Sequence, residues 1–267
     1  MSQILYKYRC WDDDDHKRML EEREIFFTSP TSFNDPFDCK IGFNFFDMDE
    51  GVVERKAQRF FERHGQHISK MERLFRADEK LHEFKNDRKT EEGREKFISN
   101  FWRRIEANTA VFSLSEIRHD ILMWSHYSDK HKGYCVGFDK EKLIEAIYSF
   151  STSDIVFWDS AVTYQPDYPK EIVEGVPNEN PDWSVILITK ALQWEYEREY
   201  RFILNGGTNQ QIVLPDGVIS EVLIGALANE TTRKEIEEVV QSSNSGIKLF
   251  QARLAKDKFA LEFDEIE

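Results

Sequence analysis

Alternating apolar and polar residues predict several short β-strands in this chain. Residues 4–9 place two tyrosines on one face and Lys7 with Arg9 on the other, because successive strand side chains point to opposite sides. Short apolar or alternating runs predict further strands at 24–28, 110–115, 133–138, 211–214, 220–225 and 247–251, a strand pair at 154–164, and an edge strand at 259–263.

The run at residues 194–202 is predicted to be a strand with an acidic face. In that register Glu195, Glu197, Glu199 and Arg201 share one side of the strand. Carboxylates in a row repel one another, so such a face must be hydrated, paired with cations, or used for chemistry. Carboxylates that are used bind metal ions, exchange protons or stabilise cationic transition states. For an isolated Glu-x-Glu, the hydrated or paired face is the more common outcome.

Helical periodicity separates these strands. Helices are predicted over residues 12–24, 119–128, 139–150 and 231–243, and residues 185–192 fit either a helix or a strand. Residues 51–107 lack proline, are rich in Glu, Lys and Arg, and fit two or three helices inserted into the domain. Residues 165–182 hold four of the seven prolines and fit either a surface loop or a helix with prolines at its ends.

These elements predict an α+β fold in a single domain spanning residues 1–267. The domain would have a central mixed β-sheet, the helical insertion at 51–107, and a C-terminal strand–helix–strand unit that resembles a βαβ crossover. The length of 267 residues and the apolar fraction of 40% suffice for one substantial core.

The composition indicates where in the cell the protein is expected and which binding partners are disfavoured. The net charge is −14 and the pI is near 5.1, which disfavours nucleic acid and anionic membranes as partners but leaves a local basic groove open. No apolar run approaches the ~20 residues that span a bilayer, and the N-terminus does not resemble a signal peptide. Cys10, Cys39 and Cys135 form no paired motif, which suits a reducing cytoplasm.

Cations and hydroxyls on the other strands are candidate ligand contacts. Lys7 and Arg9 could grip phosphate groups or pair with the acidic strand. Ser113 and Ser115 share a strand face and could line a polar cleft, although ordinary edge serines fit the same pattern.

Two further segments carry polar groups with open roles. His126 beside Tyr127 is either a proton-transfer or stacking pair, or a structural histidine; a zinc site is disfavoured because His131 lies five residues away rather than four. Asp35 and Asp38 belong to a turn, and the functional alternative is that one of them orients a cation such as Arg9. No P-loop, GxGxxG, HExxH, GxSxG or CxxC pattern occurs.

Several of these segments, taken together and in order, resemble a known bacterial family. They are residues 5–8, 33–38, 112–113, 123–127 with Gly133, and Lys190 with residues 194–201. The combination resembles the family known as domain of unknown function 2971, over nearly the whole chain, with 51–107 as its variable part. The resemblance implies architecture more than activity, and it suggests a role in phage defence or as a toxin-like effector.

A second, weaker resemblance concerns chemistry. Toxin-type ADP-ribosyltransferases carry an Arg on the first strand, then a Ser-containing strand, then a Glu-x-Glu strand, and the same order is filled here by Arg9, Ser113 with Ser115, and Glu197 with Glu199. The resemblance implies that Arg9 grips the pyrophosphate of NAD and that the serines brace the nicotinamide ribose. Glu199 would stabilise the oxocarbenium ion and orient the nucleophile.

The chain departs from that pattern in two places. Leu114 stands at the middle of the usual Ser-Thr-Ser motif, and about eighty residues separate the serines from the glutamates. The resemblance also gives no role to His126 and Tyr127.

The leading prediction is therefore a cytoplasmic enzyme that acts on NAD or another nucleotide, with NAD as substrate and no metal or resident cofactor. The catalytic candidates are Glu199, Glu197 and His126, and the substrate-binding candidates are Lys7, Arg9, Ser113, Ser115, Tyr127, Lys190 and Arg201.

Two alternatives stay open. In a metal-dependent nuclease, Mg²⁺ would be held by Glu197, Glu199, Asp35 or Asp38, and Lys190. In a non-catalytic binding module, Arg9 and Arg201 would simply pair with the acidic strand. The sequence does not predict an oligomeric state.

Overall fold

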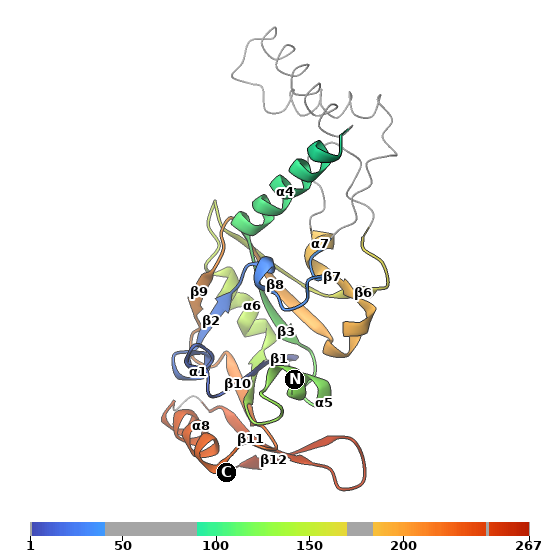
Figure 1. Ribbon diagram of the computed structural model, residues 1–267. Coiled ribbons are helices and arrows are strands. Elements are labelled where there is room, and N and C mark those ends of the chain that lie inside the picture. The colour runs from blue at the N-terminus through green and yellow to red at the C-terminus, as the bar shows by residue number, and fades with distance from the viewer. Residues whose placement is uncertain (1, 41–89, 170–183, 244–245, 267) are drawn as a thin grey trace.

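The computed structural model describes residues 2–40, 90–169, 184–243 and 246–266 (Figure 1). Of the predicted helical insertion, residues 51–89 lie outside this part of the chain, as does most of the proline-rich segment at 165–182. The described remainder of the insertion is helical, in α4 (Glu91–Asn108). In the described residues, no helix is long and apolar enough to cross a membrane.

A mixed eight-stranded sheet forms the centre of the fold, with strand order β12-β11-β10-β4-β1-β3-β8-β5. Its strands are β1 (Ile4–Arg9), β3 (Thr109–Ser115), β4 (Tyr134–Asp139), β5 (Val156–Ala161), β8 (Glu199–Asn205), β10 (Ile219–Ile224), β11 (Lys248–Leu254) and β12 (Leu261–Ile266). Two small sheets flank it, formed by β2 (Glu24–Phe27) with β9 (Gln210–Val213) and by β6 (Thr163–Gln165) with β7 (Thr189–Ala191). The predicted α+β class with a central mixed sheet is confirmed.

The helices begin where side chains can accept the free N–H groups of a first turn. Asp13, Thr90, Asp120, Asp139 and Asn229 cap the helices that follow them. Besides α4, these helices are α1 (Asp14–Glu21), α5 (Ile121–Tyr127), α6 (Lys140–Tyr148) and α8 (Glu230–Ser242), and the chain also contains α7 (Ser184–Ile188) and the 3₁₀ helices η1 (Pro30–Ser32) and η2 (Leu192–Glu197).

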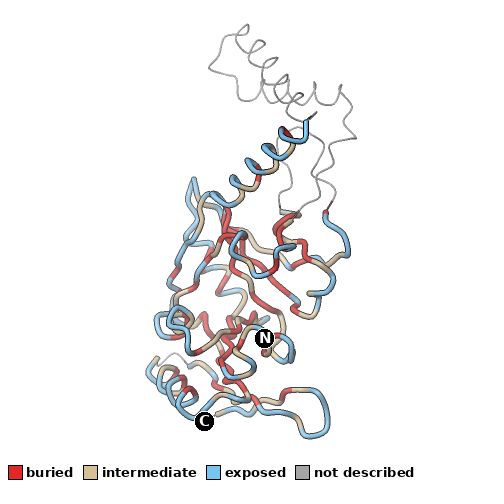
Figure 2. The backbone as a smooth tube through the Cα atoms, viewed as in Figure 1, coloured by how far each residue is buried: buried red, intermediate tan, exposed pale blue. Residues whose placement is uncertain are grey.

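The centre of the sheet is buried on both faces, as strand β4 shows. Tyr134, Val136 and Phe138 join the larger core, which α1, α6, α8 and β2 cover, whereas Cys135 packs with Trp124 of α5 on the opposite face. The alternation follows from the period of two along a strand. Figure 2 shows the buried chain concentrated in the sheet, with most of α4 and the turn between β11 and β12 exposed.

The sheet has one weak seam, between β1 and β3. These strands pair only at Tyr6 with Ser115, whereas β1 pairs with β4 at six positions and β3 pairs with β8 at seven. Beyond that one pair, no backbone pairing joins the described strands β1 and β3. The functional cavity lies at this seam.

The C-terminal unit agrees with its prediction. Strands β10 and β11 are parallel, and α8 connects them across the larger core, which is the geometry of a βαβ crossover. Strand β12 then pairs with β11 as the predicted edge strand.

The prediction of a single strand over residues 194–202 is wrong in its first half. Residues up to Glu197 form η2, Arg198 adopts a left-handed conformation with φ of 43°, and β8 begins at Glu199. Trp194 and Glu195 therefore lie in a helical turn. Two smaller corrections apply nearby: β5 and β6 pair with other strands and not with each other, and residues 185–192 hold the end of α7, all of β7 and the first residue of η2.

Candidate functional site

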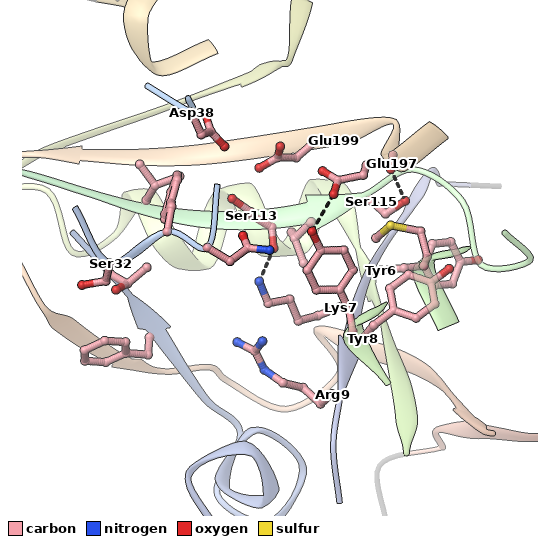
Figure 3. Close-up of a pocket in the computed structure, with 18 of the residues that line it drawn as sticks. Tyr6, Lys7, Tyr8, Arg9, Ser32, Asp38, Ser113, Ser115, Glu197 and Glu199 are labelled. Carbon is pink, nitrogen blue, oxygen red and sulfur yellow. Dashed lines mark hydrogen bonds between the residues drawn. The ribbon is translucent and has the colours of Figure 1, made fainter. Parts of the chain in front are cut away.

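A cavity of about 480 Å³ opens at the seam between β1 and β3 (Figure 3). Side chains from β1, β3, α5, β7, η2 and β8 line it, together with His16 of α1 and the segment that contains Asn34 and Asp38. The separation of the two strands lets side chains from both faces of the sheet reach one space. A volume of this size suits a single small-molecule ligand.

One wall of the cavity is a group of carboxylates around a lysine. The Lys190 Nζ lies 2.5 Å from Glu197 Oε2, 3.1 Å from Glu199 Oε2 and 3.6 Å from Asp38 Oδ2. All four side chains are buried. Lys190 therefore occupies the position among three carboxylates where a free cation would otherwise bind.

Arg201 holds this wall from behind. Its Nε donates to Glu199 Oε1 at 2.7 Å and its Nη2 donates to Glu199 Oε2 at 2.9 Å, so the guanidinium grips the carboxylate with two parallel hydrogen bonds. The same Nη2 donates to Asp38 at 2.6 Å, and Nη1 donates to the carbonyl of Leu187 at 2.7 Å. Arg201 is fully buried, so this grip fixes Glu199 in one geometry.

The buried wall carries a net negative charge when all of its groups are ionised. Asp38, Glu197 and Glu199 bring three negative charges, while Lys190 and Arg201 bring two positive ones. Burial penalises an uncompensated charge, so protonation of one carboxylate relieves the wall.

The two glutamates of this wall have pKa values shifted in opposite directions. Burial raises the pKa of Glu197, although Lys190 works against the rise. Burial also acts to raise the pKa of Glu199, but Arg201 and Lys190 outweigh it and hold that pKa well below its ordinary value. Glu199 therefore stays ionised, and Glu197 is the carboxylate suited to exchange a proton.

Hydrogen bonds from α5, β3 and β6 position these glutamates. The Tyr127 hydroxyl donates to Glu197 Oε1 at 2.6 Å, and the Ser115 hydroxyl donates to the backbone carbonyl of Glu197 at 2.6 Å. The N–H of Glu199 donates to the hydroxyl of Tyr164 at 2.7 Å. The turn at Arg198 is thus held on both sides.

The facing side of the cavity is cationic. Figure 3 shows Lys7 and Arg9 across the cavity from Asp38, Glu197 and Glu199. Among the described residues, neither Lys7 nor Arg9 lies within ion-pair distance of a carboxylate. Burial lowers the pKa of Arg9, and burial together with Arg9 lowers the pKa of Lys7 well below its ordinary value.

Two buried polar atoms on this side, Arg9 Nε and His16 Nδ1, form no hydrogen bond with the described residues, although His16 Nδ1 lies 3.8 Å from Asp13 Oδ2. Buried donors and acceptors are nearly always satisfied in folded proteins. A cationic surface with unmet hydrogen-bonding capacity is chemically suited to an anionic ligand.

The structure brings together most of the site residues expected from the sequence. Those that line the cavity are Lys7, Arg9, Ser113, Ser115, Tyr127, Lys190, Glu197 and Glu199. Arg201 lies behind it, against Glu199. His126 is exposed, does not line the cavity, and has its ring 6.4 Å from that of Tyr196.

The ion-pair partners expected for Arg9 and Asp38 are corrected, whereas Asp35 makes the turn contact expected of it. Arg9 does not pair with the acidic wall, whereas Arg201 does. Asp38 contacts Arg201 and Lys190 rather than Arg9. The Asp35 side chain accepts the N–H of Phe37 at 2.9 Å, which is the expected turn contact.

Sequence reasoning gave no role to His16, Asn34 or Tyr164. His16 lies within a predicted charged helix, where no spacing distinguished it from a solvent-facing residue. Asn34 belongs to the 33–38 segment that carries the family resemblance, but its residue type there is equally typical of a turn.

Part of this site lies in a segment that is similar to a known family. Residues 123–202 match the family model described as "Protein of unknown function (DUF2971)", which confirms the resemblance over that segment. The matched residues include Tyr127, Lys190, Glu197, Glu199 and Arg201. No curated protein and no solved structure matches the chain.

Proposed function

We propose that this protein is an enzyme that binds a nucleotide in the cavity between β1 and β3 and cleaves its N-glycosidic bond in the manner of an ADP-ribosyltransferase. NAD is the first candidate substrate. One observation carries the proposal: Lys7 and Arg9, which form no ion pair with a carboxylate of the described residues, face a buried pair of glutamates across a single cavity. A nucleotide with a phosphate at one end and a reacting ribose at the other matches that polarity.

The cationic side would hold the phosphates. Arg9 offers a planar set of donors that fits phosphate oxygens, and its buried Nε has no other partner. Lys7 would add a second contact from the same strand.

The acidic wall would carry out the reaction. Arg201 and Lys190 lower the pKa of Glu199 and so favour its ionised form, which suits it to stabilise the oxocarbenium ion that forms as the bond to nicotinamide breaks. Glu197 would take the proton from the water or acceptor hydroxyl that attacks the anomeric carbon. Tyr127, Lys190 and Arg201 would position the two glutamates, and the mechanism uses no group from His126.

The order of the strands supports this proposal. Arg9, the Ser113–Ser115 pair and Glu199 lie on β1, β3 and β8, which are neighbours in the sheet. The three motifs that prompted the resemblance to ADP-ribosyltransferases therefore meet at one cavity, although they are far apart in the sequence.

The test is NAD consumption by the purified protein, with and without cell extract to supply an acceptor. We expect Glu197→Gln and Glu199→Gln each to lower turnover by about 100-fold or more, the usual effect of removing a general base or an electrostatic stabiliser. Glu195→Gln is the matched control, because Glu195 is exposed and lies outside the cavity. Equal turnover in wild type and Glu197→Gln would contradict the assigned role.

The two alternative functions predict different results in the same samples. A nuclease would cleave nucleic acid only with Mg²⁺ and would leave NAD intact; Lys190 already fills the centre of the carboxylate group, which does not favour it. A binding module would bind a nucleotide without turnover. A cytoplasmic location and a role in phage defence or toxin action are further proposals that follow from composition and from the family resemblance.

A further inference from the structure

The cavity contains two lysines in opposite surroundings. Lys190 lies within 3.6 Å of three carboxylates. No carboxylate of the described part of the chain lies that close to Lys7, whose Nζ donates to the carbonyl of Ser113 at 2.6 Å and lies 5.2 Å from the centre of the Phe112 ring. The surroundings of Lys7 are thus a neutral acceptor and an apolar ring.

The charges farther from Lys7 do not compensate for the lack of a nearby carboxylate. Arg9 follows on the same strand face and repels an ammonium ion there. The remaining titratable groups that act on Lys7 or are acted on by it are His16 from α1, Glu197 and Glu199 across the cavity, and Lys190 from β7. Burial and Arg9 outweigh the two glutamates, so the pKa of Lys7 falls, whereas the carboxylates around Lys190 overcome its burial and raise its pKa. Lys7 is therefore the lysine of the pair that loses its proton more readily.

We propose that Lys7 is a reactive amine that forms an imine with a phosphate-bearing aldehyde. Lys7 is half-buried and lines the cavity, so a ligand in the cavity can reach its Nζ. Arg9, with its unpartnered buried Nε, stands beside it to hold the phosphate. A lysine that is desolvated and placed next to another cation is a known arrangement for amine nucleophiles. This inference is independent of the proposed NAD chemistry.

The reaction needs no oxidant or metal. The Lys7 nitrogen attacks the carbonyl carbon, and the displaced electron pair moves to the oxygen. The nitrogen loses a proton, the oxygen gains one, and the carbinolamine expels water to give the C=N bond. The carbonyl of Ser113 accepts one N–H of Lys7, which orients the amine before attack.

The probe is pyridoxal 5′-phosphate, added at neutral pH to the full chain and followed by borohydride, which reduces the imine to a stable secondary amine. Peptide mass spectrometry then gives the labelling rate at each lysine. We expect Lys7 to be labelled at least about tenfold faster than exposed lysines, since each unit of pKa depression raises the free-amine fraction about tenfold. Lys190 is the internal control and should stay unlabelled.

Three variations test the parts of the proposal. Pyridoxal, which lacks the phosphate, should label Lys7 about tenfold more slowly. Arg9→Gln should slow labelling by pyridoxal phosphate, because it removes both the phosphate contact and the neighbouring cation. Lys132→Arg is the matched control and should leave labelling at Lys7 unchanged, because Lys132 is exposed and outside the cavity.

Labelling of Lys7 no faster than that of exposed lysines, or preferential labelling of Lys190, would overturn the proposal. Equal labelling by pyridoxal and pyridoxal phosphate would overturn the phosphate requirement. The decisive comparison uses the wild-type chain, so it does not depend on whether a variant folds. It also involves no NAD turnover, so its failure is distinct from failure of the proposed function.

Discussion

At the scale of single residues, Glu197 and Glu199 show how surroundings divide the roles of two identical side chains. Both are buried and both contact Lys190, but only Glu199 is gripped by Arg201. The sequence singled out these carboxylates but left open whether they are used for chemistry or simply hydrated or paired. It did not indicate which one titrates, because that depends on Arg201 and Asp38 meeting Glu199 and Lys190 in three dimensions.

The same substitution at the two positions should change stability in opposite ways. Glu197→Gln removes the uncompensated charge and keeps an acceptor for Tyr127, so the free energy of unfolding should stay equal or rise by about 1 kcal/mol. Glu199→Gln leaves Arg201 buried without its bidentate partner, which should cost about 3–5 kcal/mol. Urea unfolding of both variants measures the contrast, and a larger loss in Glu197→Gln would contradict it.

The raised pKa of Glu197 also predicts a pH dependence. Its pKa is higher in the folded than in the unfolded protein, so the folded state binds the extra proton and its stability falls as pH rises from about 4.5 through the folded pKa. Above that range the loss is complete and constant. The stability of Glu197→Gln relative to wild type should therefore increase over the same interval and then level off. Unfolding midpoints across pH 4–8 give the difference, and a flat difference would refute the assignment.

At the scale of elements, the turn at Arg198 decides the geometry of the site. The sequence around it alternates well enough to predict one continuous strand, and alternation carries no information about a single left-handed residue. Because the chain turns there, Glu197 ends η2 and Glu199 begins β8, and Lys190 lies between their carboxylates. The elements with caps or long apolar runs were predictable because local signals determine them.

A substitution series at Arg198 tests that turn. Its side chain is exposed and contributes only a surface ion pair with Glu116 at 3.3 Å, so the backbone conformation dominates. Arg198→Gly should hold or raise the free energy of unfolding by up to about 1 kcal/mol, because glycine adopts positive φ without steric cost. Arg198→Val should lower it by about 1–2 kcal/mol, because a β-branched residue is strained there. Equal stability of the two variants would show that the turn is not left-handed.

At the scale of the whole molecule, the cationic side of the cavity contrasts with a chain whose net charge is −14. The overall charge disfavours large polyanions, and the cavity offers Lys7 and Arg9 to a ligand small enough to enter. Composition predicted the first property. The second required knowing that β1 and β3 are neighbours and that Arg9 does not pair with the acidic strand, and neither fact is encoded in local sequence patterns.

The single pairing of Tyr6 with Ser115 has a mechanical consequence. It divides the large sheet into a leaf of five strands, from β12 to β1, and a leaf of three strands, from β3 to β5, which share one rung of the hydrogen-bonded ladder. Lys7 and Arg9 lie on the first leaf, and Glu199 and Arg201 lie on the second. A ligand that contacts both leaves would connect them across the seam. Binding of a ligand in the cavity would therefore also join the two parts of the sheet.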